Sequence, residues 1–149
     1  MSLNAAMPNF VAGTVVTEAN LDALAAGLDG VQAAWTAFTP SVATWTLGNG
    51  TIVGRYMRIG KTIRFQIKLT LGTTTTTSTS LALGNLPVAS HADWASGMRW
   101  VARDVSASGS FFGDADLLGS ATAFNCRVTT PFTWADTDYI AVDGTYEAA

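Results

Sequence analysis

Two pairs of aspartates, each pair separated by one residue, have a spacing that could do chemistry. They are Asp114 with Asp116 and Asp136 with Asp138. Such carboxylates can hold Ca²⁺ through their oxygens, and a glycoside hydrolase needs two of them at a fixed separation across a cleft. Aspartates in turns instead accept hydrogen bonds from their own backbone. We expect all four to be turn aspartates. A Ca²⁺ site is the first alternative and a catalytic pair the second, and we expect no other metal or cofactor.

The polar segment around residue 91 offers a second set of reactive groups. His91 is the only histidine and lies near Asp93, so a Ser-His-Asp hydrolase is conceivable. The sequence has no G-x-S-x-G elbow to support it, and we expect His91 to be a solvated loop residue. Trp94 follows in the same loop, where an exposed indole can stack on a sugar ring. Trp94 and His91 are therefore the candidate receptor contacts.

The composition limits the function classes. Charged residues make up only 13% of the 149 residues and hydrophobic residues 48%, whereas an average soluble chain has about 25% charged residues. Either Thr and Ser cover much of the surface, or apolar surface is buried between subunits. Five basic residues cluster between positions 55 and 68, but the net charge is −3. We expect these basic side chains on the outer face of a strand pair, and no nucleic-acid binding.

Other sequence features exclude further classes. No apolar run approaches the roughly 18 residues of a membrane span, and the first residues lack the basic region of a signal peptide. Membrane insertion is therefore not expected. Cys126 is the only cysteine, so an internal disulfide is excluded. It alternates with Phe124 and Val128, which predicts a small buried hydrophobe.

An apolar seam precedes the rest of the chain. Its members follow one another at steps of three, four, three and four residues, the pattern by which a helix packs against a copy of itself. They are Leu21, Leu24, Leu28, Val31 and Trp35. Thr17 can cap a helix running from about 18 to 35, and a helix this short is marginal alone in water. We predict an oligomerisation helix over residues 17–35. The pattern is compatible with a coiled coil of two, three or four such helices.

From residue 36 onward the sequence has the alternating apolar runs and turn residues of β-structure. Runs at 51–59 and 62–71 flank Gly60 and Lys61, and apolar residues alternate with polar ones in the second run, which predicts a hairpin. Asn49-Gly50 is a tight-turn signal, and the Thr-rich run 72–80 is either a loop or an exposed edge. Further short runs continue at regular spacing. The pattern predicts a mainly β fold, an antiparallel jelly-roll-like β-sandwich of roughly eight strands over residues 36–149.

Several motifs carry a family resemblance. Residues 35–40 read W-x-x-F-T-P, residues 48–51 read G-N-G-T, and residues 54–61 read G-R-Y-x-x-x-G-K. The ending "PFTWADTDYIAVDGTYEAA" and the early stretch "FVAGTVVTEANLDAL" have the same character. With these features the chain resembles the short fibre and minor tail proteins of tailed bacteriophages, especially those of actinobacteria.

The resemblance implies a structural, non-enzymatic virion protein, made in the host cytoplasm and carried on the surface of the particle. Such proteins are usually homotrimers, so the seam would lead into three β domains that attach to the host surface, with a glycan as the expected ligand. Residues 1–16 would attach the fibre to another virion protein. The contacts expected there are Met7, Pro8, Phe10 and Val11. A head fibre or decoration protein of the capsid, and an enzyme that degrades host polysaccharide, remain as alternatives.

Overall fold

The computed structural model describes residues 17–29, 34–92, 96–117 and 121–149. One helix precedes nine strands. In chain order they are α1 (Glu18–Asp29), β1 (Thr36–Phe38), β2 (Ser41–Val42), β3 (Thr51–Ile59), β4 (Thr62–Thr70), β5 (Ser80–Gly84), β6 (Ser96–Asp104), β7 (Gly109–Leu117), β8 (Phe124–Arg127) and β9 (Tyr139–Glu147). The mainly β prediction is confirmed.

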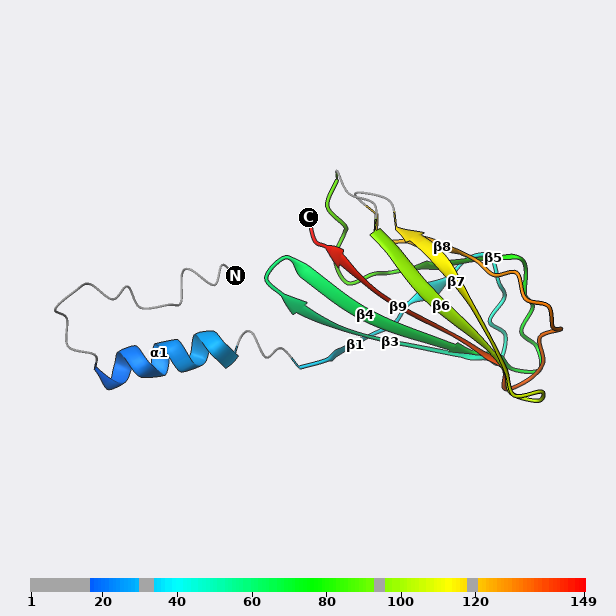
Figure 1. The fold of residues 1–149 in the computed structure, drawn as a ribbon, viewed down its shortest axis with the longest axis horizontal. Coiled ribbons are helices and arrows are strands. Elements are labelled where there is room, and N and C mark those ends of the chain that lie inside the picture. The colour runs from blue at the N-terminus through cyan, green and yellow to red at the C-terminus, as the bar shows by residue number, and fades with distance from the viewer. Residues whose placement is uncertain (1–16, 30–33, 93–95, 118–120) are drawn as a thin grey trace.

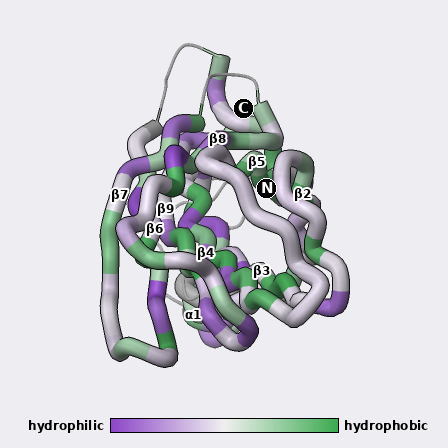
Figure 2. Tube along the Cα trace, turned by 90° about the vertical axis from the view of Figure 1, so that its right-hand side faces the viewer, coloured by the Kyte–Doolittle hydropathy of each residue, from purple (hydrophilic) through white to green (hydrophobic). Residues whose placement is uncertain are grey.

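The nine strands form one antiparallel sheet in the order β1-β3-β4-β9-β6-β7-β8-β5-β2. Figure 1 shows the long strands side by side, and Figure 2, turned by 90°, shows the sheet curling back on itself. The curl brings Phe65 of β4 against Phe124 of β8, with ring centroids 5.6 Å apart. The core therefore lies inside one curled sheet, which is a coarser description than the predicted jelly-roll sandwich.

The β3–β4 hairpin is confirmed with its predicted turn. The two strands pair antiparallel from Thr51↔Thr70 to Ile59↔Thr62, and Gly60 in the turn has a φ of 60°, which glycine adopts without a steric penalty. On β4 the apolar residues Ile63, Phe65, Ile67 and Leu69 are buried. Burying each such side chain contributes about 1.5–3 kcal/mol, so the period-two pattern fixes which face of the hairpin turns inward.

The turn before β3 positions the Thr-rich segment. It is closed by a hydrogen bond from the Gly50 N–H to the Leu47 carbonyl at 2.9 Å, so its central residues are Gly48 and Asn49 rather than the predicted Asn49-Gly50. Gly48 has a φ of 58°. The Asn49 side chain accepts hydrogen bonds from the Thr74 backbone N–H and hydroxyl, both at 2.9 Å. Residues 72–79 are thus a loop tied to this turn.

The helix differs from its prediction in length. Thr17 caps it, because the Thr17 hydroxyl accepts the Asn20 N–H at 3.3 Å. The described helix ends at Asp29, and Trp35 lies in a non-helical segment directly before β1. The extension of a helical seam to Trp35 is therefore wrong: Trp35 takes its place beside the sheet, where its ring covers Arg55.

The remaining seam positions lie apart from the core. The core cluster of the described residues includes no residue of α1. Leu21 is 55% exposed and Leu24 is half-buried. Val31 and the side chain of Leu28 lie outside what the structure describes. The packing of the helix against a copy of itself stays a prediction.

Candidate functional site

The two aspartate pairs occupy different parts of the fold. Asp114 and Asp116 lie exposed on one face of β7, and Asp136 is exposed in the loop before β9. Asp138 is only 1% exposed. Its two carboxylate oxygens accept the Val105 N–H at 2.9 Å and the Ala135 N–H at 2.8 Å. Asp138 therefore bonds the backbone of its own loop, as a turn aspartate does, and also that of the β6–β7 turn. Among the described residues no group of three or more His, Cys, Asp or Glu is placed to hold a metal ion.

Of the two candidate receptor residues, the structure describes His91, at the end of the β domain where the chain enters it. The pairing Thr36↔Tyr56 puts the start of β1 near the β3–β4 turn. His91 is near the same end, because its N–H donates to the Glu147 carbonyl at 2.8 Å and the adjacent Ala148 N–H donates to the Lys61 carbonyl at 2.7 Å. His91 is half-buried rather than fully solvated. Trp94 and the attachment residues Met7, Pro8, Phe10 and Val11 lie outside the described residues.

The opposite end, which we call the distal end, is built from loops. It contains the Thr-rich loop 72–79, the β6–β7 turn and the loop 128–138, at the far side of the sheet from the β3–β4 turn (Figure 1). Four aromatic rings pack in a chain at this end, and Phe132 and Trp134 of the loop 128–138 are its middle members. The ring centroid of Phe132 lies 5.2 Å from that of Phe111 and 4.8 Å from that of Trp134. The ring centroid of Trp134 lies 5.4 Å from that of Trp45. Asp138 binds the β6–β7 turn to the loop before β9, so this end is held in one arrangement.

A second surface spans five strands on the side that points away from the core. We call this side of β3, β4, β9, β6 and β7 the outer sheet face. One row of cross-strand neighbours on it runs Val53, Lys68, Ala141, Val101 and Phe112. The next row runs Arg55, Gln66, Asp143, Arg99 and Asp114. An apolar row with one lysine thus lies beside a row of charged and amide groups.

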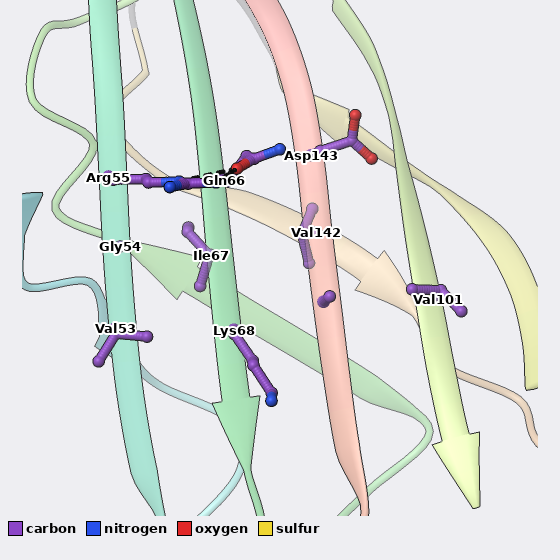
Figure 3. Close-up of a pocket in the computed structure, with 10 residues that line it drawn as sticks. Val53, Gly54, Arg55, Gln66, Ile67, Lys68, Val101, Val142 and Asp143 are labelled. Carbon is purple, nitrogen blue, oxygen red and sulfur yellow. Dashed lines mark hydrogen bonds between the residues drawn. The ribbon is translucent and has the colours of Figure 1, made fainter. Parts of the chain in front are cut away.

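The members of both rows on β3, β4 and β9, together with Val101 on β6, line a groove of about 630 Å³. In Figure 3 the Arg55 and Gln66 side chains lie across the sheet at one height, with Val53, Lys68 and Val101 at the next. The Arg55 Nε and Nη2 donate to Gln66 Oε1 at 2.8 and 2.6 Å. The Trp35 ring covers the Arg55 guanidinium at 4.6 Å, and Lys68 Nζ lies 4.3 Å from the centre of the Tyr139 ring.

Charge alternates from strand to strand across the outer sheet face. Arg55, Arg64 and Lys68 are exposed on β3 and β4, and Asp143 and Glu147 are exposed on the neighbouring β9. Arg99 on β6 lies across from both Asp143 and Asp114, and Asp116 is also exposed on β7. Of the predicted basic cluster, Arg55, Arg64 and Lys68 lie on the outer face as expected. Arg58 pairs with the inward-facing Ile63 at the hairpin end, and Lys61 lies in the turn, so the prediction is wrong for these two.

Sequence reasoning did not single out Phe112, the most exposed large apolar residue of those described, at 77% exposure. The alternation of polar and apolar residues in the stretch "SFFGDAD" could have identified its exposure. Phe112 alternates in step with Ser110, Asp114 and Asp116, all exposed, whereas Phe111 is half-buried in step with the buried Ala115.

Comparison of the chain with protein-family models, with curated proteins and with solved structures finds no match. Within the described residues, no helix has the length and apolar character needed to cross a membrane.

Proposed function

We propose that this chain is a trimeric, non-enzymatic fibre or minor tail protein of a phage particle, whose β domain attaches to the host surface, with a glycan as ligand. The observation that carries the proposal is the division of the chain into a helix with no side chain in the core cluster of the described residues and a β domain with three of its loops gathered at the far end. In this proposal the helix is the stalk and the β domain is the head. The fibre-like motifs at Trp35–Pro40, Gly48–Thr51 and Gly54–Lys61 add to it.

The helix gains its stability from copies of itself in this proposal. α1 has 12 residues, and an isolated helix of that length is marginal in water. Leu21 is 55% exposed in the single chain, and burying a leucine contributes about 1.5–3 kcal/mol. Three copies packed along Leu21 and Leu24 as a short coiled coil supply that burial three times over. The finer fold proposal is that the curled sheet serves as a jelly-roll-like head.

The distal end is the surface we assign to the host ligand. Thr73 and Thr77 are exposed there and offer hydroxyl groups, whereas the Thr74 hydroxyl is already bonded to Asn49. The half-buried Phe132 and Trp134 offer aromatic surface. Hydroxyls beside aromatic rings suit a sugar, which needs both hydrogen bonds and a flat apolar contact. Three heads on one stalk present three such sites, so weak single contacts add to useful avidity. His91 lies at the other end and has no part in this assignment.

The first experiment is the solution mass of the purified chain by light scattering. One chain is 15.6 kDa, and we expect a particle of three times that mass. Leu24→Asp places a charge in the seam and should release monomers, whereas Ala23→Asp adds the same charge beside the seam and should leave the trimer intact. A monomeric wild-type protein at micromolar concentration contradicts the fibre proposal.

The second experiment separates the tail from the head of the particle. Phage particles are labelled with an antibody against the β domain and imaged by electron microscopy, and we expect label at the tail. Label on the capsid assigns the chain to a head fibre or decoration protein instead. In parallel the purified trimer is mixed with host cell-wall polysaccharide. Binding without released oligosaccharide is the expected result, and released product points to the enzyme alternative.

A further inference from the structure

We infer that Asn49 is a positioning residue that sets the specificity of the distal end: it fixes the Thr73 hydroxyl as a hydrogen-bond donor, which meets a glycan oxygen that only accepts. Oxygens of this kind in a glycan are those of the sugar ring, of the glycosidic bond and of an acetamido carbonyl. The inference rests on the ligand surface proposed above and adds the polarity with which one of its groups meets the ligand.

The first argument is the orientation of the Asn49 carboxamide between the turn before β3 and the Thr-rich loop. Asn49 Oδ1 accepts the Thr74 backbone N–H and hydroxyl, both at 2.9 Å, and Asn49 Nδ2 donates to Thr73 Oγ1 at 3.0 Å. A backbone N–H can only donate, so the carboxamide atom that faces it is the oxygen. The nitrogen then faces Thr73, and the Thr73 oxygen must accept.

The second argument is that the two threonine hydroxyls bonded to Asn49 use their protons differently. The Thr74 hydroxyl accepts the Asn49 backbone N–H and donates to Asn49 Oδ1, both at 2.9 Å, so its single proton is used within the protein. In the part of the chain that the structure describes, the Thr73 hydroxyl accepts from Asn49 and donates to no protein group. A hydroxyl carries one proton and rotates about its C–O bond. Because Thr73 is exposed, that proton is available to a ligand.

The third argument is that other bonds hold the loop in place without the Asn49 nitrogen. Thr75 Oγ1 donates to the Leu47 carbonyl at 2.6 Å and accepts the Gly72 N–H at 2.9 Å. The turn and the loop also pack closely, because a Cβ atom at Gly72 would overlap the Asn49 carboxamide. Exchanging the Asn49 nitrogen for an oxygen therefore changes the polarity of one hydroxyl and leaves the two segments tied together.

The test is Asn49→Asp, which makes that exchange. One carboxylate oxygen still accepts from Thr74, whereas the Thr73 hydroxyl turns to donate to the other and presents only lone pairs to the ligand. The probe is a set of short oligosaccharides released from host cell-wall polysaccharide, and binding is measured by isothermal titration calorimetry. We expect Asn49→Asp to weaken binding about five- to tenfold at neutral pH, as for one lost hydrogen bond. Thr73→Val removes the hydroxyl at constant shape and should weaken binding equally, and the two changes combined should cause no further loss.

The pH dependence separates a change of polarity from a merely structural effect. An aspartate carboxyl is protonated below about pH 4, and its O–H then donates to Thr73 as the amide does. Relative to wild type, binding by Asn49→Asp should therefore recover as the pH falls from about 6 to about 3. Asn125→Asp, the same change at an exposed position on β8, is the control and should bind like wild type throughout.

The outcomes separate this inference from the proposed function. A wild-type protein that binds none of the oligosaccharides removes the proposed ligand surface and the inference with it. Wild-type binding that Thr73→Val weakens but Asn49→Asp does not overturns the inference alone, because the ligand group is then a hydroxyl that reverses its own bond. Wild-type binding that neither variant weakens, or a loss in Asn49→Asp that persists at low pH, also overturns the inference alone. Thermal unfolding by circular dichroism at each pH confirms that each variant folds.

Discussion

Replacing Asp138 tests whether its buried carboxylate stabilises the distal end by accepting hydrogen bonds or serves as a ligand for Ca²⁺. Asp138→Ala removes the acceptor for two backbone N–H groups, those of Val105 and Ala135, and leaves both without their partner at a site where Asp138 is 1% exposed. A hydrogen bond to a charged group contributes about 1.5–3 kcal/mol. We therefore expect Asp138→Ala to lower the free energy of unfolding by about 3–5 kcal/mol, at the upper end for a single substitution.

The conservative variant Asp138→Asn should have a free energy of unfolding between those of the wild type and Asp138→Ala. Asp138→Asn keeps one oxygen acceptor and turns an amide N–H₂ toward the second backbone N–H, so we expect a loss of about 2 kcal/mol. The assay is thermal unfolding followed by circular dichroism. For a chain of this size 1 kcal/mol corresponds to about 2–4 °C, so Asp138→Ala should melt about 10 °C below wild type. Asp136→Ala, at an exposed position in the same loop, is the matched control and should melt within about 2 °C of wild type.

Calcium separates the two interpretations of this residue. Each unfolding curve is repeated with millimolar Ca²⁺ and with a chelator. A structural turn carboxylate predicts the same melting temperature in both, because no ion is bound to the folded state. A rise with Ca²⁺ that disappears in Asp138→Asn would refute the reasoning, since ligand binding stabilises only the state that binds it. A wild-type-like melting temperature for Asp138→Ala would refute it as well.

Three further predictions follow from the described contacts. Phe112→Ser should leave the free energy of unfolding within about 0.5 kcal/mol of wild type, measured by urea unfolding, because the side chain is 77% exposed and surface substitutions change stability little. Burial raises the pKa of the Cys126 thiol to about 12, so a thiol reagent at pH 8 should react only after denaturant is added; reaction of the folded protein within minutes contradicts the buried position. Hydrogen bonds from the Ala107 N–H and the Ser106 hydroxyl lower the pKa of Asp104 below its ordinary 3.8. Their contribution to stability is present above about pH 4 and is lost as the pH falls through the lowered value, so Asp104→Asn should lose stability at pH 7 but little at pH 2, measured by urea unfolding at both pH values.

Local patterns were sufficient for parts of the fold. The β3–β4 hairpin was predictable because its turn and both strands are contiguous, and because period-two burial allows only one register to hide Ile63, Phe65, Ile67 and Leu69. The burial of Cys126 followed from the same alternation. β1, with three residues, was missed since so short a run carries no period. The end of the helix was predicted wrongly because Trp35 fits the heptad spacing and is equally suited to the position directly before a β-strand.

The candidate surfaces needed the tertiary structure. The row from Val53 to Phe112 joins strands that lie far apart in the sequence, and only the order β3-β4-β9-β6-β7 makes these residues neighbours. Asp138 looked like one member of an exposed D-x-D pair, yet its partner in the structure is the turn after β6. His91 and the distal loops were indistinguishable as polar segments until strand register placed them at opposite ends.

The sequence alone determined what depends on neighbours along the chain: a mainly β protein, an N-terminal helix capped at Thr17, the inward-facing residues of β4, and a composition with too little charge to cover every surface. Tertiary structure decided which strands pair, which end of the sheet receives the chain, and that an apolar row and charges of both signs share one face of the sheet. The physical reason is range. Periodicity and turn preferences act over a few residues, whereas strand order is set by the burial of one common core, and a surface exists only once that order is fixed.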